Sequence, residues 1–144
     1  MSDNKEKVEA IRRWCDVIWS QGDVQTMDEL LDPNFSFVLA FMHTDTLEAF
    51  KKLVAYNRTV FENLTYKCND AVADGLKGAC WWTMSSRHVG EWRHIPGSNK
   101  LVSIEGVTFF WFSEEGKFTK AIVENDVLGL MRQIGGVTLP YEPK

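Results

Sequence analysis

The chain is short of several features that would fix a protein class. Its 144 residues include only three cysteines and four prolines, and no tract of basic residues. An odd number of widely spaced cysteines does not make a disulfide framework and fits a reducing compartment. The missing basic tract, with a formal net charge of -4, argues against nucleic acid as a partner. No apolar run reaches the roughly 18 residues of a membrane span, and the start MSDNKEKVEA is unlike a secretory signal. We therefore expect a cytoplasmic protein.

Signals for metal or cofactor binding are also missing. His43, His88 and His94 have no metal-ligand spacing with one another or with the cysteines. The chain has no glycine-rich phosphate loop and no Gly-x-Ser-x-Gly elbow. We therefore expect no metal and no organic cofactor.

Aromatic side chains, in contrast, are abundant. The chain holds six Trp, nine Phe and three Tyr, and 44% of its residues are hydrophobic. Large rings can pack a core, and they can equally line a pocket for a flat apolar ligand. A chain of this length and composition predicts a single domain over residues 1–144.

Three helices are predicted in the first half of the chain. Asp3 and Glu6 resemble a capping box, and apolar residues at helical spacing then predict an amphipathic helix over about 4–20. A short second helix carries Met27, Leu30 and Leu31 and stops at Asp32-Pro33. A third helix runs from Leu47 to about residue 61.

Strands dominate the rest of the chain. Strands are expected over about 35–42, 64–74, 77–90, 100–112 and 117–126. Helices followed by a run of antiparallel strands predict an α+β fold, in which the N-terminal helices cover one face of a curved, mostly antiparallel sheet. Such a sheet wraps a conical cavity.

Alternation along the strand that starts near residue 77 predicts two different faces. The face expected to look into the cone carries Cys80, Trp82, Met84, Ser86 and His88. The opposite face carries Trp81, Thr83 and Ser85, a mixture of ring and polar groups that suits an interface between subunits. The second face therefore predicts a homodimer.

The sequence resembles the SnoaL-like polyketide cyclase family of the NTF2-like superfamily. The resemblance covers nearly the whole chain. The stretches that carry it are Trp19-Ser-Gln-Gly-Asp23, Met27-Asp-Glu-Leu-Leu-Asp-Pro-Asn-Phe35, Arg87-His-Val-Gly-Glu91, Ile95-Pro-Gly with Lys100, Glu115-Gly-Lys-Phe118 and Asp126-Val-Leu-Gly-Leu-Met-Arg-Gln-Ile-Gly135.

The resemblance implies an NTF2-like cone, often dimeric, without metal or cofactor. It also implies ring closure by intramolecular aldol chemistry, with an acid/base aspartate near the end of the last strand. Asp126, ahead of Gln133-Ile-Gly135, matches that position. The family's cyclases pair this aspartate with a histidine on the preceding strand, but Thr108–Phe112 contains none. His88 is the candidate for the vacant role.

Two interpretations of Asp126 remain open. As a pocket carboxylate it would have a raised pKa and could shuttle protons near neutral pH. As a plain N-cap it would only start the turn that follows. Alternation places Asp126 with Lys120 and Glu124 on the solvent side, so the pocket interpretation needs a bulge or the strand's end to turn it inward.

Further side chains are candidates for the pocket wall, although aromatic residues at such spacings often belong to the core. Tyr56 stands out because its hydroxyl could polarise a substrate carbonyl from the covering helix. The predicted substrate-binding residues are Trp14, Trp19, Phe41, His43, Tyr56, Trp82, Met84 and Trp111.

These features together predict a cofactor-independent cyclase or isomerase of secondary metabolism. Its substrate would be an apolar polyketide- or terpenoid-type small molecule, converted by general acid/base catalysis through Asp126 and His88. Two alternatives remain. One is an epoxide hydrolase or epoxide-opening cyclase of the same fold, which needs two carboxylates around a water. The other is a non-catalytic NTF2-like protein that binds a small ligand.

Overall fold

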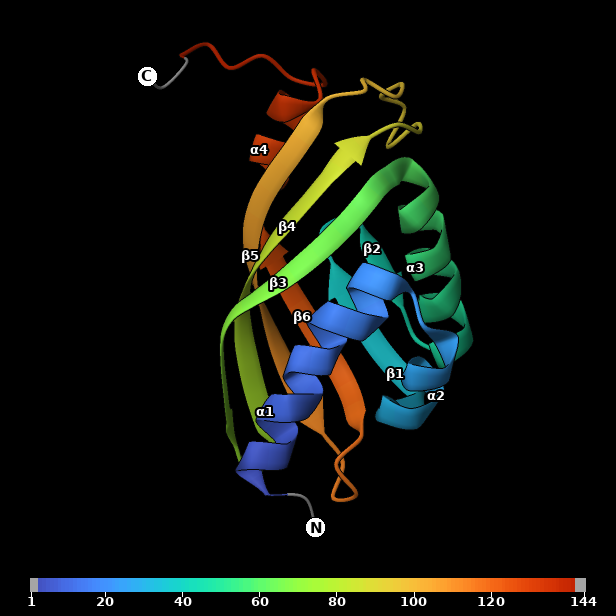
Figure 1. Ribbon diagram of the computed structural model, residues 1–144, viewed down its shortest axis with the longest axis vertical. Helices are drawn as coiled ribbons and strands as arrows, with labels where there is room; N and C mark the ends of the chain where they lie inside the picture. The colour runs from blue at the N-terminus through green and yellow to red at the C-terminus, as the bar shows by residue number, and fades with distance from the viewer. Residues whose placement is uncertain (1–2, 142–144) are drawn as a thin grey trace.

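The predicted helices and strands follow one another in the predicted order, and a short strand over 42–44 and a C-terminal helix over 127–133, neither of them predicted, are added to them (Figure 1). The computed structural model describes residues 3–141, so residues 1–2 and 142–144 of the predicted domain lie outside the described part. The elements are α1 (Asn4–Arg13), the π-helical turn η1 (Trp14–Trp19), α2 (Val24–Leu30), β1 (Leu31–Leu39), β2 (Met42–Thr44), α3 (Leu47–Val60), β3 (Phe61–Asp74), β4 (Lys77–His88), β5 (Leu101–Phe112), β6 (Phe118–Asn125) and α4 (Val127–Gln133).

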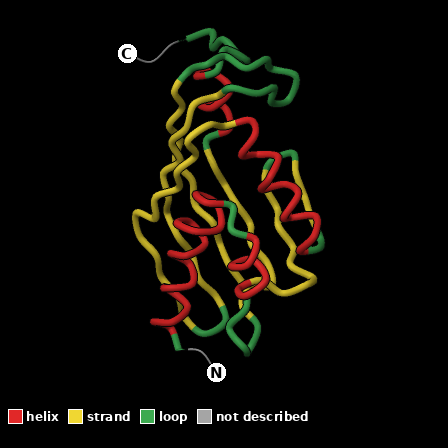
Figure 2. The backbone as a smooth tube through the Cα atoms, turned by 45° about the vertical axis from the view of Figure 1, so that its right-hand side comes forward, coloured by secondary structure: helices red, strands yellow, loops and turns green. Residues whose placement is uncertain are grey.

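Within the described residues, six strands form one sheet in the order β2-β1-β6-β5-β4-β3. Neighbouring strands are antiparallel except β1 and β6, which are parallel. The sheet is curved, and α1 and α3 lie against the same side of it (Figure 2). The predicted α+β cone with helices on a mostly antiparallel sheet is therefore confirmed. No described helix has the length and apolar character to cross a membrane.

The first helix widens at its C-terminal end. The π-helical turn η1 holds Trp14 and Trp19, which are five positions apart. In an α-helix such residues point about 140° apart, whereas the wider π turn brings them toward one face. Their ring centroids lie 6.0 Å apart, and both rings are buried. The π turn thus presents two indoles to the sheet where an α-helix would present one.

The core is built around Trp14, which is 2% exposed. Its ring stacks on Phe50 at 5.4 Å and meets the edges of Phe35 and Phe110 at 5.7 and 5.3 Å. Because offset and edge contacts between rings add to area burial, this cluster fastens η1 and α3 to the sheet.

The sheet's alternation follows the prediction for β4. Trp82, Met84 and His88 are buried, whereas Trp81 is 49% exposed on the opposite face. Trp82 lies opposite Gly106 of β5, and Gly106 lies opposite Asn125 of β6. A Cβ at Gly106 would overlap the Trp82 ring and approach the Asn125 Cβ to 2.9 Å. Glycine at this position is what allows Trp82 and Asn125 to share the concave face.

The predicted boundary between the second helix and the first strand is wrong. Leu31, expected in the helix, is buried in β1, and β1 ends at Leu39 rather than at residue 42. Leu31 pairs with Phe118 of β6. This contact between distant segments outweighs the local helical spacing, as tertiary context often does. Phe41 then lies in the turn to β2 with φ 70°.

Cysteines that are far apart in the sequence meet in the fold. The thiol of Cys15 hydrogen-bonds to that of Cys80, and Cys68 lies beside them. This contact and burial together raise the pKa of Cys15 far above its usual value. All three are free. No cluster of three or more possible metal-binding side chains occurs among the residues that the structure describes.

The Gln133-Ile-Gly135 motif has a structural role. The Gln133 side chain accepts a hydrogen bond from the Ser103 N–H at 2.9 Å and donates one to the Ser103 carbonyl at 3.0 Å. The β5–β6 ladder begins only at Gly106. Gln133 therefore continues the pairing along β5 after β6 has ended and fixes α4 against the sheet.

Candidate functional site

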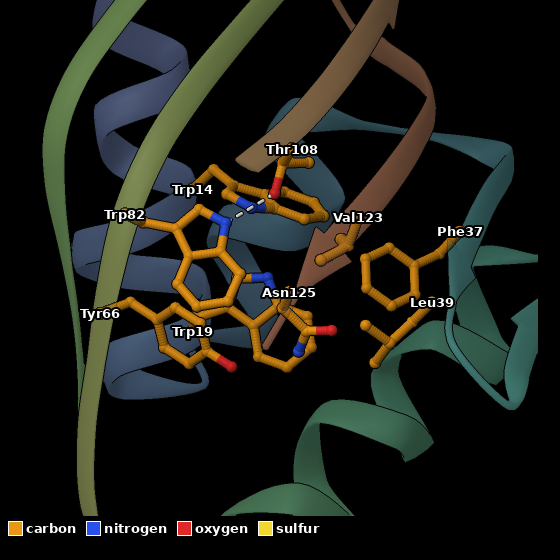
Figure 3. Close-up of a pocket in the computed structure, with 9 residues that line it drawn as sticks. All are labelled: Trp14, Trp19, Phe37, Leu39, Tyr66, Trp82, Thr108, Val123 and Asn125. Atoms are coloured by element: carbon orange, nitrogen blue, oxygen red, sulfur yellow. Dashed lines mark hydrogen bonds between the residues drawn. The ribbon is translucent and has the colours of Figure 1, made fainter. Parts of the chain in front are cut away.

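Two adjoining hollows lie on the concave side of the sheet. The inner pocket is small, about 30 Å³, and its lining is drawn in Figure 3. The outer pocket is about 240 Å³ and opens to the surface. Leu39 and Asn125 line both. The remaining lining residues are Trp14, Trp19, Phe37, Tyr66, Trp82, Thr108 and Val123 in the inner pocket, and Ala40, Met42, Leu53, Tyr56, Asn57, Trp92, Arg93, Val127 and Leu130 in the outer pocket.

The inner pocket has an aromatic wall with polar groups inserted in it. The Tyr66 ring packs between Trp19 at 5.3 Å and Trp82 at 5.0 Å. The Trp82 indole N–H donates a hydrogen bond to the Thr108 hydroxyl at 2.8 Å. That bond crosses from β4 to β5 and fixes the orientation of the indole in the pocket wall (Figure 3).

The Tyr66 hydroxyl is a hydrogen-bond donor in the inner pocket. Burial raises the pKa of Tyr66 well above its usual value, so the phenol stays protonated at neutral pH. Among the described residues, the hydrogen bonds of Tyr66 with side chains are made by its backbone with the Ser20 hydroxyl, and its own hydroxyl has no partner. It is therefore available to donate to a ligand oxygen.

Asn125 supplies an acceptor at the boundary between the two pockets. Its Oδ1 is buried and has no hydrogen-bond partner within the described part of the chain. Leaving such a group unpaired costs about 1–3 kcal/mol, so buried acceptors of this kind call for an explanation. A hydroxyl donor on a ligand held in the pockets would satisfy it.

The pockets contain few titratable groups. Tyr66 is the inner pocket's titratable side chain, and Tyr56 and Arg93 are those of the outer pocket. Among the described lining residues there is no carboxylate and no imidazole. The two-carboxylate geometry of the epoxide-hydrolase alternative therefore has no counterpart in this lining.

Asp126 does not lie in the pocket, so that prediction is wrong. Its side chain is exposed and caps α4, with Oδ1 accepting a hydrogen bond from the Gly129 N–H at 2.8 Å. Val123 and Asn125 face inward, and strand alternation then turns Asp126 outward, because the described end of β6 has no bulge to reverse it. The carboxylate instead borders a shallow groove on the outer face. Asp126 is thus an N-cap, the second of the two interpretations that the sequence allowed.

His88 is buried as predicted, but it does not meet Asp126. The level of Asn125 and Asp126 corresponds to Trp82 on β4, and His88 lies six residues further along, which is about 20 Å. His88 Nδ1 accepts a hydrogen bond from the Ser98 N–H at 3.1 Å. Burial lowers the pKa of His88, which favours the neutral ring. His88 therefore anchors the loop over residues 89–100 rather than joining a catalytic pair.

Some predicted wall residues are in place. Trp14, Trp19 and Trp82 line the inner pocket. Tyr56 lines the outer one, where its hydroxyl donates a hydrogen bond to the Glu91 carbonyl at 3.1 Å. The Tyr56 hydroxyl is therefore already used in a hydrogen bond at the rim, whereas the Tyr66 hydroxyl can donate to a ligand carbonyl.

Other predicted wall residues lie elsewhere. Met84 is buried in the core beside Ser86. His43 is exposed and pairs with Asp45 at 2.9 Å. Trp111 faces away from the cone because Phe110 takes the inward position on β5. Phe41 is 66% exposed in its turn and contacts Arg93 at the rim of the outer pocket.

Sequence reasoning missed Tyr66, Asn125 and Arg93. Alternation from the buried Val123 indicates Asn125 as the inward residue, so its signal was present in the sequence. Tyr66 had no such signal, because β3 contains two register shifts, one between Glu62 and Thr65 and one after Cys68. Each shift interrupts the regular alternation of faces.

The model of a protein family described as SnoaL-like polyketide cyclase matches residues 9–134. No curated protein sequence matches the chain.

Solved structures agree on the fold. TsrD from Streptomyces laurentii is 25% identical, with 92% of this chain and 95% of that chain covered and a TM-score of 0.79. A candidate SnoaL-like polyketide cyclase from Jannaschia sp. CCS1 is 19% identical, covers 96% of this chain and 100% of that chain, and has a TM-score of 0.84. A Catenulispora acidiphila protein with a ketosteroid isomerase-like fold is 13% identical, with 94% and 98% covered and a TM-score of 0.76.

Proposed function

Because the chain belongs to the SnoaL-like polyketide cyclase family, we propose that it binds a flat, mostly apolar polyketide-type molecule and closes or isomerises a ring in it. The observation that carries the proposal is the unpaired Asn125 acceptor in the same aromatic pocket as the free Tyr66 hydroxyl. A donor and an acceptor in an otherwise apolar hollow suit a ligand that has a carbonyl and an enol or phenol.

In this mechanism the two polar groups hold the two reacting ends of one molecule. The Tyr66 hydroxyl donates a hydrogen bond to the electrophilic carbonyl oxygen, where negative charge develops. Asn125 Oδ1 accepts a hydrogen bond from the enol hydroxyl of the other end and keeps the enol carbon over that carbonyl. Orientation of this kind lowers the barrier because the two ends need not search for each other.

The step conserves atoms and electrons. The enol C=C π bond breaks to form a carbon–carbon bond with the carbonyl carbon, the enol C–O becomes a ketone C=O, and the C=O π bond of the electrophile becomes a C–O single bond. The enol proton passes to solvent at the open mouth of the outer pocket and the new alkoxide takes up one proton from the same solvent, so the product is a ring ketol. The aromatic walls exclude bulk water, which strengthens both hydrogen bonds during the step.

A second candidate is a protein that binds such a ligand without converting it. It is favoured by the described lining, which contains no carboxylate or imidazole to move a proton. Both candidates share the pocket and the ligand class. They differ only in turnover.

The test uses 1-phenylhexane-1,5-dione, which closes to 3-phenylcyclohex-2-enone with loss of water and a change in ultraviolet absorption. We expect saturable acceleration by the protein and competitive inhibition by 2-naphthol, whose hydroxyl can donate to Asn125. The methyl ether of 2-naphthol should bind about tenfold more weakly, since it leaves a buried acceptor unpaired. An Asn125→Leu variant should lose that preference. Binding without acceleration supports the second candidate, and no binding of 2-naphthol contradicts both.

We also propose a symmetric homodimer formed through the outer face of the sheet. Trp81 and Val107 lie opposite each other on β4 and β5, and they are 49% and 48% exposed. Val72 and Phe109, 61% and 40% exposed, extend the apolar face. Exposed apolar groups gathered on one face mark an interaction surface, and a two-fold axis lets the patch bury itself against its own copy.

Sedimentation at micromolar concentration should therefore give twice the 16.5 kDa chain mass. Trp81→Arg should weaken the dimer at least about 30-fold, because a central Trp commonly contributes about 2 kcal/mol or more. Val24→Arg is the matched control: Val24 is also 49% exposed but lies on α2. A wild-type monomer, or equal weakening by both changes, would contradict this interface.

A further inference from the structure

The rim of the outer pocket is formed by a tight turn in the loop over residues 89–100. Trp92 and Ile95 close the turn with two backbone hydrogen bonds of 2.9 and 2.8 Å. Its central residues, Arg93 and His94, have φ angles of 50° and 67°. Glycine and asparagine favour such left-handed positions, whereas other residues are strained there. Backbone strain of this kind is concentrated at functional sites, so Arg93 is a candidate functional residue.

The Arg93 guanidinium lies close to two aromatic rings at this rim. Its Cζ is 4.9 Å from the centroid of Phe41 and 5.5 Å from that of Trp92. Phe41 also has a positive φ, 70°. Two turns from distant parts of the chain thus adopt unfavourable backbone conformations and meet through one arginine. The rings orient the planar cation and leave its N–H groups free to bind an anion.

Arg93 is the charged residue of the described pocket lining. It forms no ion pair within the described residues. The protein as a whole carries a net charge of -4, so its overall field does not attract anions. A single cation at the mouth of an apolar pocket therefore provides a local and selective site for one negative group.

We propose that Arg93 binds a carboxylate of the ligand at the rim of the outer pocket, so that the natural ligand is a polyketide-type or aromatic acid. This proposal rests on the function proposed above and specifies its substrate class. A carboxylate matches the two parallel N–H groups of a guanidinium. With the carboxylate at Arg93, the apolar rings fill the outer pocket and the far end of the ligand reaches Asn125, which lines both hollows.

The test compares 6-hydroxy-2-naphthoate with its methyl ester, measured by isothermal titration at low ionic strength. We expect the wild type to bind the acid about tenfold to a hundredfold more tightly, the range of a charge-assisted hydrogen-bonded pair. Arg93→Gln should remove this preference without changing the affinity for the ester. Arg93→Lys should keep part of it, since it preserves the charge but loses the planar fork. Lys52→Gln, an equal change of charge at an exposed position of α3, should leave the preference intact.

The outcomes distinguish failure of the carboxylate site at Arg93 from failure of the proposed function. If acid and ester bind the wild type equally, or if the preference survives Arg93→Gln, the carboxylate site is wrong and the apolar pocket stands. If neither probe binds, the proposed function fails, and the carboxylate site fails with it.

Discussion

A Tyr66→Phe variant is expected to close the ring of 1-phenylhexane-1,5-dione about 10²- to 10³-fold more slowly than the wild type, the usual loss on removing one donor to a developing oxyanion. The hydroxyl donates to the carbonyl oxygen in the proposed mechanism, and phenylalanine keeps the ring between Trp19 and Trp82. KM should change little, because the lost bond strengthens mainly in the transition state. Steady-state kinetics on both proteins measures the effect.

Asp126→Asn is the control for that experiment. The asparagine preserves an N-cap acceptor for the Gly129 N–H, and the position lies outside both pockets. Its turnover and melting temperature should match the wild type. If Asp126→Asn were inactive and Tyr66→Phe fully active, the reaction would belong to the outer groove and the proposed mechanism would be wrong.

Trp14→Ala should produce the largest loss of stability, about 3–5 kcal/mol, the range for removing a buried Trp or Phe ring. Trp14 is 2% exposed and contacts Trp19, Phe50 and Phe110. Its removal leaves a cavity whose walls belong to three different elements and cannot easily collapse. Denaturant unfolding followed by circular dichroism gives the free energy directly.

The comparison for Trp14→Ala is Trp111→Ala, which removes the same side chain from the outer face of β5. Its loss should be less than half as large, because the ring there is only partly buried and packs against Phe109 at 4.8 Å and Lys120 at 5.4 Å rather than inside the core. Equal losses at the two positions would mean that the cluster around Trp14 does not organise the core.

The order of helices and strands was predictable because it depends on local periodicity and turn residues. The alternation that places Trp82 inward on β4 is of this kind, and so is the helical spacing of Trp14. The start of β1 was not predictable, since Leu31 joins the strand through a partner on β6. The meeting of Cys15 with Cys80 likewise depends on how the first helix crosses the sheet.

The candidate site was harder to predict for two reasons, one at the end of β6 and one in β3. The resemblance pointed to the carboxylate at the end of the last strand, Asp126, although alternation favoured its neighbour Asn125. One position along a strand reverses the direction of a side chain. Tyr66 lies between two register shifts of β3, and such bulges leave no reliable mark in a single sequence.

The π turn also restricts where a residue can be deleted from this chain without disturbing the packing of α1. Deleting one codon between Trp14 and Trp19 would turn η1 into an ordinary α-helical turn and rotate α1 by about 100° about its axis. Ile11 and Lys7, buried on the sheet side of α1, would swing out of contact, and the Lys7 bond to the Gly75 carbonyl would be lost. The same deletion in the exposed turn near Glu115 would leave this packing untouched. Related sequences that lack the extra residue should therefore carry the apolar stripe of the first helix displaced by one position.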